Sequence, residues 1–180
     1  MKKLLALFIT IALCVAYILP LLAADAQYIG AKKCMMCHKS EKRGDQWGKW
    51  SEGPHAKAFE TLKNEQSQQI AKEMGIDDPT KADKCLKCHV TAHGVPAAQK
   101  ADSFDPTEGV GCEVCHGPGS LYKSMKVMKA LYAGEQDPKE VAFKKGSKET
   151  CLECHNEESP TYKPFDFEKR WAEIEHTIPE

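Results

Sequence analysis

The feature that most constrains this chain is a five-residue motif, Cys-x-x-Cys-His, which occurs four times. Two cysteines at this spacing, followed at once by a histidine, are the attachment pattern for c-type haem: the thiols bond to the porphyrin and the histidine ligates the iron. Only one cysteine, Cys14, lies outside the motifs. The motifs predict four covalently bound haem c groups (iron), attached through Cys34, Cys37, Cys85, Cys88, Cys112, Cys115, Cys151 and Cys154, with proximal ligands His38, His89, His116 and His155.

Two other interpretations of paired cysteines explain less. Zinc sites can be built from pairs of Cys-x-x-Cys, but they do not need a histidine directly after each pair. Disulfides are common in exported proteins, yet they too leave the four trailing histidines without a role. Covalent haem accounts for both the cysteines and the histidines.

The N-terminus has the pattern of a secretory signal peptide. Lys2 and Lys3 precede an apolar run from Leu4 to Leu22, and Ala24-Asp25-Ala26 offers a small-x-small cleavage site. We therefore predict a signal peptide over residues 1–26 and a periplasmic or otherwise exported protein. Because the apolar run is long for a signal peptide, an uncleaved membrane anchor is the alternative. Export agrees with haem attachment of this kind, which takes place outside the bacterial cytoplasm.

Residues 27–180 are expected to form a single tetrahaem domain, mainly α with long irregular loops. Helical patterns run over residues 54–74, 121–133, 138–145 and 167–176, and no strand pattern of any length appears. On the second helix, Met125, Met128, Leu131 and Tyr132 form the expected buried stripe. So short a chain has few apolar side chains for each haem. We therefore predict a core built around the four haems and a largely unfolded apo chain.

The formal net charge of −1 gives no reason to expect nucleic acid as a partner. Lysines are scattered, with small groups at Lys32-Lys33 and Lys144-Lys145, which fit a solvated face or a weak docking patch for an acidic redox protein. The expected partners are a redox donor and a redox acceptor, and a membrane only if the N-terminal segment stays uncleaved.

Three histidines outside the motifs, His55, His93 and His176, are predicted to be distal iron ligands. A haem that only transfers electrons gains from a second strong axial ligand, which blocks substrate binding. His93 follows His89 by four residues, so it cannot reach the opposite face of the same haem and serves another haem or none. His55 opens a predicted helix. His176 ends the last one and could serve the fourth haem or a haem of a neighbouring molecule.

With three spare histidines for four irons, one haem lacks a second histidine. That haem is five-coordinate and open to small molecules, or it takes a methionine, or it is completed by a second chain. The methionines considered are Met74, Met125 and Met128.

Three stretches resemble one known family. They are Tyr28-Ile29-Gly30 before the first motif, Trp50-Ser51 ahead of His55-Ala56-Lys57-Ala58, and Gly109-Val110-Gly111-Cys112-Glu113 with Gly117-Pro118-Gly119-Ser120 around the third motif. They resemble the tetrahaem cytochrome c-554 family. The resemblance implies an α-helical protein that shuttles electrons through four covalent haems packed in close pairs. It also implies a five-coordinate haem at the second motif and places His55 and His93 on haems of other motifs.

The function predicted from the sequence is electron transfer between redox partners through a closely packed haem chain. No acid–base or nucleophilic constellation is visible, so an enzyme is the less favoured alternative: an oxidoreductase that reduces a small nitrogen oxide such as NO at the open haem. A further alternative is a subunit of a haem-wire assembly, in which histidines cross between subunits.

Overall fold

The structure is a computed structural model that describes residues 26–176 and 178. The predicted signal peptide, residues 1–26, lies outside the described residues except for Ala26. Within the described part the fold is helical, as predicted, and its one β feature is an isolated parallel bridge between Tyr28 and Lys100. No described helix is both long and apolar enough to span a membrane.

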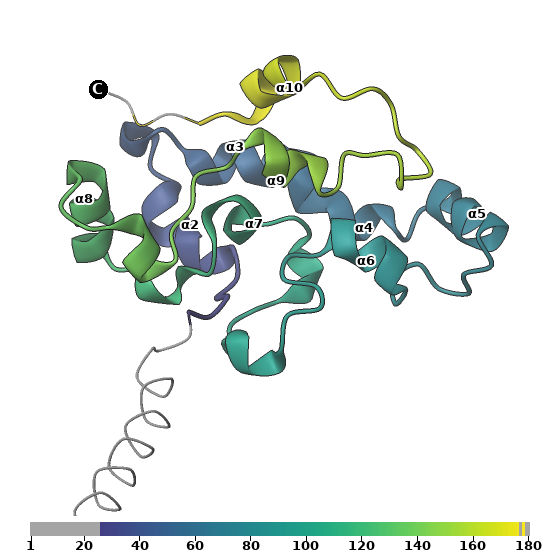
Figure 1. Ribbon diagram of the computed structural model, residues 1–180, viewed down its shortest axis with the longest axis horizontal. Helices are drawn as coiled ribbons and strands as arrows, with labels where there is room; N and C mark the ends of the chain where they lie inside the picture. The colour runs from purple at the N-terminus through teal and green to yellow at the C-terminus, as the bar shows by residue number, and fades with distance from the viewer. Residues whose placement is uncertain (1–25, 177, 179–180) are drawn as a thin grey trace, which may run out of the picture.

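Nine short α-helices are joined by long loops and single 3-10 turns. The α-helices are α2 (Lys32–His38), α3 (Gln46–Glu52), α4 (Ala58–Thr61), α5 (Glu65–Glu73), α6 (Asp83–His89), α7 (Cys112–His116), α8 (Met125–Ala133), α9 (Lys148–Leu152) and α10 (Phe167–Ile174), all within the described residues. The 3-10 turns are η2 (Glu41–Arg43), η3 (His55–Lys57), η4 (Ala97–Gln99), η5 (Pro106–Glu108), η6 (Gly119–Leu121) and η7 (Pro138–Val141). Along the longest axis, α8 lies at one end, α5 at the other, and α7 near the middle (Figure 1).

Each haem motif coincides with one of these short helices. The first three motifs lie within or at the end of α2, α6 and α7, and α9 ends at Leu152, inside the fourth motif. A helical turn brings both cysteines of a Cys-x-x-Cys pair to the same side, because residues three apart are neighbours on a helix surface. The local structure therefore suits two thioether bonds to one ring.

The single helix predicted over residues 54–74 is interrupted in the structure. The chain there forms η3, then α4, then α5, because Asn64 adopts an extended conformation and its side chain caps α5 by accepting a hydrogen bond from the Ser67 N–H. The predicted helix over residues 138–145 is also shorter: η7 stops at Val141 because Ala142 takes a left-handed conformation, with φ of 57°. The last helix ends at Ile174, so His176 lies beyond it.

The predicted buried stripe on α8 is a second correction. Met125 is 50% exposed and Tyr132 is 76% exposed, and no residue of α8 is buried. The helix forms but begins at Met125 and not at Leu121, because the Ser124 side chain caps its start; Gly134 ends it with φ of 73°. The amphipathic pattern therefore located the helix but not its packing partner, because the polypeptide covers little of its apolar face.

The polypeptide supplies only a small apolar core. Among the described residues, the buried apolar side chains are Ile29, Ala31, Leu62, Ala71, Pro79, Val90, Tyr122 and Val141. By contrast, every motif cysteine is half-buried and none is covered completely. The chain thus surrounds the four motifs without enclosing them in a conventional hydrophobic core.

Candidate haem sites

The four motifs approach one another through their cysteines in the order first, third, fourth, second. The side chain of Cys34 in the first motif hydrogen-bonds to that of Cys112 in the third, which raises the pKa of the Cys34 thiol and lowers that of Cys112. The other cysteine of the third motif, Cys115, lies within electrostatic range of Cys151 in the fourth. Cys154 in turn hydrogen-bonds to Cys88 of the second motif. These interactions relate the four attachment sites in that order.

The thiols themselves are free to react. All eight motif cysteines are unpaired, so no disulfide joins any of the described residues. Burial is the main factor that raises the pKa of Cys115 to about 11 and that of Cys154 to about 12. No group of three or more described His, Cys, Asp or Glu side chains lies together as a metal site.

Three of the four motif histidines have their Nδ1 atom fixed by an oxygen acceptor. Nδ1 of His89 lies 2.6 Å from the Ala58 carbonyl oxygen, and Nδ1 of His116 lies 3.2 Å from that of Lys144. Nδ1 of His38 lies 3.2 Å from Oε1 of Gln46. An Nδ1–H that donates to oxygen leaves Nε2 as the free lone pair, which is the usual arrangement of a metal-bound histidine. These residues therefore fit an axial iron ligand.

The fourth motif histidine is oriented by stacking. The ring of His155 lies against Phe165, with centroids 4.6 Å apart and planes inclined by 15°. The ring of His116 stacks in the same way on Phe143, at 5.6 Å and 9°. A stacked aromatic ring limits rotation of an imidazole, so these two histidines are held in orientation as well as in position.

Two of the three spare histidines lie beside a motif histidine. The ring centroids of His55 and His155 are 6.1 Å apart, and those of His176 and His116 are 5.9 Å apart. With metal–nitrogen bonds of about 2 Å, two imidazoles on opposite sides of one metal have ring centres about 6 Å apart. The structure thus brings His176 to the third motif, whereas the sequence offered the fourth motif or a neighbouring molecule.

The third spare histidine, His93, has no such neighbour among the ring contacts of the described residues. Its Nε2 atom lies 3.1 Å from Oδ1 of Asp83, at the start of α6. Its ring is therefore turned towards the helix that carries the second motif.

Burial favours the neutral form of three of these histidines, His55, His116 and His155. It is the main cause that lowers the pKa of His55, with the charge on His155 second. Burial likewise lowers the pKa of His116 and of His155. Metals bind the neutral form of imidazole, so this environment favours ligation.

Two acidic residues that the sequence reasoning missed connect the first and third motifs. Glu113, only 2% exposed, accepts hydrogen bonds from the N–H groups of Ile29, Gly30 and Gly119. Glu108 accepts one from the Ala31 N–H at 2.6 Å, just before α2. Burial is the main influence on Glu113 and raises its pKa. No local pattern predicts the contacts with Ile29, Gly30 and Ala31, because they join residues far apart in the sequence.

The candidate methionines are placed unevenly. α8, which carries Met125 and Met128, lies far along the molecule from α6 and the second motif (Figure 1). Met74 follows α5 and is 40% exposed. None of the three is buried.

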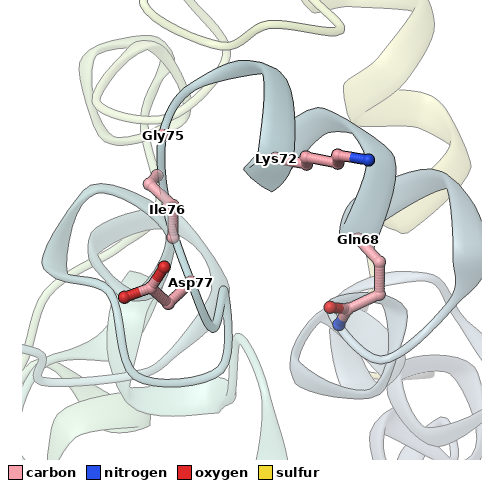
Figure 2. Close-up of a pocket in the computed structure, with 5 residues that line it drawn as sticks. All are labelled: Gln68, Lys72, Gly75, Ile76 and Asp77. Atoms are coloured by element: carbon pink, nitrogen blue, oxygen red, sulfur yellow. The ribbon is translucent and has the colours of Figure 1, made fainter.

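An open pocket of about 440 Å³ lies beside α5, away from the motifs. Figure 2 shows its lining, which consists of Gln68, Lys72, Gly75, Ile76 and Asp77. It contains no motif residue and no spare histidine, so it is not part of the haem sites.

A helical fold organised around repeated Cys-x-x-Cys-His motifs, with motif histidines oriented for metal binding, defines a c-type cytochrome, a class that binds haem c covalently. Residues 33–117 match the family described as "Cytochrome c554 and c-prime". Cytochrome c-554 of Nitrosomonas europaea is 37% identical over 145 residues, which cover 74% of this chain and 60% of that protein. The chain belongs to the cytochrome c-554 family. It spans about 60% of the length of this relative, and no solved structure matches it significantly.

Proposed function

We propose that this protein is an exported tetrahaem electron carrier, in which electrons pass along the four motifs in the order first, third, fourth, second. The observation that carries the proposal is that cysteines of successive motifs influence each other's thiol pKa, in the pairs Cys34 and Cys112, Cys115 and Cys151, and Cys154 and Cys88. Thioether bonds at neighbouring cysteines hold neighbouring rings close, as a relay requires. The first and second motifs are then the two ends of the series, and the third and fourth lie between them.

The proposed iron ligands follow the histidine pairs. Each motif supplies its two cysteines and its own histidine. His55 is the distal ligand at the fourth motif and His176 at the third, on the support of the ring separations of 6.1 and 5.9 Å. His93 is assigned to the first motif by exclusion, because the other two pairs are complete and it cannot reach the far face above His89. The haem of the second motif is left five-coordinate.

Each haem, when bound, supplies one-electron redox chemistry. The residues of the chain hold the rings, fix the imidazoles and limit access of water. The backbone carbonyls of Ala58 and Lys144 orient His89 and His116 through Nδ1. A hydrogen bond at Nδ1 raises the basicity of the ligand nitrogen, and this is one way in which a protein sets a redox potential.

One face is suited to an acidic redox partner. The segment 123–148, here called the lysine face, contains seven lysines and three acidic residues, a net charge of +4, while the whole chain has −1. All seven lysines are exposed, and none makes an ion pair within the described residues. The Lys144 N–H donates to the His116 carbonyl at 3.0 Å, so the lysine face lies directly against the third motif. Such a field speeds encounter with an acidic protein.

A mass spectrum and an electron paramagnetic resonance (EPR) spectrum of the purified protein test the proposal. The expected mass is that of the chain without residues 1–26 plus four haems. The expected ferric spectrum contains three low-spin signals and one high-spin signal. A mass without four added haems contradicts the tetrahaem carrier, and four low-spin signals in a monomer contradict the open haem at the second motif.

A second candidate function is reduction of a small nitrogen oxide at the second motif. It is favoured by the surroundings of His89, whose imidazole contacts only Ala58 and Thr61 among the described hydrogen-bonding partners. Turnover of NO by the reduced protein would establish it, and binding without turnover would leave the carrier function. The haem-wire alternative has less support, because His176 lies beside His116 of its own chain.

A further inference from the structure

We propose that Gly109 and Thr91 are positioning residues that hold His55 at the fourth motif. The inference rests on the proposed role of His55 as a distal ligand. It concerns what fixes that ligand in space, since His55 lies far from the fourth motif in the sequence.

The local helix around His55 is too short to hold it. η3 contains three residues, His55–Lys57, and no side chain caps it. A single turn of 3-10 helix has weak hydrogen-bond geometry and little stability of its own. The backbone of His55 must therefore be fixed by contacts with other segments.

Those contacts come from the residues that precede the third motif. The Val110 N–H donates to the His55 carbonyl oxygen at 3.0 Å. Gly109 lies against the same carbonyl, and a Cβ atom on Gly109 would come within 2.7 Å of it and 3.0 Å of the Ala56 carbonyl oxygen. Gly109 has φ of 75°. Only a residue without a side chain allows this approach at this conformation.

Thr91 fixes the segment from its other side. Its N–H and its hydroxyl both donate to the Gly109 carbonyl, at 3.0 and 2.8 Å, and its hydroxyl oxygen accepts from the Gly111 N–H at 2.7 Å. The side chain is buried, with 5% of the residue exposed. Because a buried hydroxyl with a donor and an acceptor bond has one preferred orientation, Thr91 clamps residues 109–111.

The indole of Trp50 adds a third support. Its Nε1–H donates to the Val110 carbonyl at 2.8 Å, from the helix that precedes His55. Residues 109–111 are thus held on both sides and in turn hold His55. The same short segment leads directly into Cys112, and Thr91 follows His89 by two residues. The same group of contacts therefore links the second, third and fourth motifs. It fixes the position of His55 relative to all three.

The principal test replaces Gly109→Ala in the complete holoprotein. Gly134→Ala is a matched control, because Gly134 has a similar φ of 73° but no atom within 4 Å of an added Cβ, and it adjoins none of the proposed ligands. We expect G109A to keep four covalent haems by mass and to convert one low-spin EPR signal into a high-spin signal. G134A should retain the parent spectrum. An unchanged spectrum in G109A, or the same conversion in G134A, overturns the inference.

If G109A does not assemble, a second pair of variants tests the positioning role. Thr91→Val removes the hydroxyl and keeps the shape, and Thr91→Ser keeps the hydroxyl. We expect T91V to show a high-spin fraction that T91S lacks. Parent-like EPR in T91V, or equal high-spin fractions in T91V and T91S, overturns the inference.

His55→Gly separates this inference from the ligand assignment. If His55 is the distal ligand, H55G gains a high-spin signal that added imidazole returns to low spin. A parent-like spectrum in H55G contradicts the assignment itself and the inference with it. A high-spin H55G with parent-like G109A and T91V overturns only the positioning role.

Discussion

The imidazole of His176 lies beside that of His116, with ring centroids 5.9 Å apart. His176 stands two residues beyond α10, on the C-terminal segment, while His116 ends α7 near the middle of the molecule (Figure 1). The His116 ring also stacks on Phe143, with centroids 5.6 Å apart. The segment after α10 therefore lies against the third motif, which is why His176 is the distal ligand we propose there.

Replacing His176 with Ala should open the third haem. We expect four haems by mass, one fewer low-spin signal and one additional high-spin signal in the EPR spectrum, and a higher reduction potential, because an imidazole ligand favours ferric iron more than a weaker ligand does. Glu175→Ala, which alters the neighbouring exposed residue, is the control and should leave the spectrum unchanged. Parent-like signals in H176A would assign the third haem a different distal ligand.

Replacing Glu113 with Gln should destabilise the holoprotein. The carboxylate accepts hydrogen bonds from the N–H groups of Ile29, Gly30 and Gly119. A glutamine amide has a single acceptor oxygen, and its NH2 group would face these N–H donors. We expect a loss of about 1–3 kcal/mol in the free energy of unfolding, measured with guanidinium chloride. Glu60→Gln removes an exposed carboxylate and should cost about 0.5 kcal/mol or less. Equal effects of the two substitutions would contradict a special role for Glu113.

The sequence was sufficient for the parts of the site that are local. Five consecutive residues specify each attachment motif, and the predicted last helix does begin at Phe167, where the Asp166 side chain caps it. The same kind of pattern wrongly predicted one continuous helix where the structure has η3, α4 and α5. Asn64 is extended and caps α5, but an asparagine at that place in the sequence does not by itself indicate a break.

Contacts between distant segments could not be read in this way. Glu113 reaches Ile29 across 84 positions, and the ring of His55 lies beside that of His155 although the two are far apart in the sequence. Such contacts depend on how the loops between the motifs fold, and those loops have neither periodicity nor characteristic turns. The prediction that the apolar stripe of α8 is buried was wrong for a related reason. Periodicity identifies an apolar face but not what covers it.

Protein produced without haem attachment should be largely unfolded. The buried apolar side chains of the described residues are few and several are small, such as Ala31 and Ala71, so the polypeptide alone gains little from burial against its conformational entropy. We expect far-ultraviolet circular dichroism of the four-motif Cys→Ser chain to show mostly disordered structure, while the matured protein is helical. A cooperative thermal transition in the haem-free chain would contradict a haem-built core.

Substitutions in the lysine face should slow electron transfer to an anionic acceptor. Lys126→Glu with Lys129→Glu reverses two charges on α8, and Lys72→Glu with Lys84→Glu makes the same net change on α5 and α6, at the other end of the molecule (Figure 1). With hexacyanoferrate(III) as acceptor, we expect the first pair to lower the second-order rate constant for oxidation of the reduced protein by about threefold to tenfold at low ionic strength. The difference should shrink as salt is added, because the Debye length falls to about 10 Å at 0.1 M. The control pair should change the rate less, since its lysines lie far from the third motif. Equal decreases for both pairs would show that net charge alone governs the encounter, and would remove the lysine face as the docking surface.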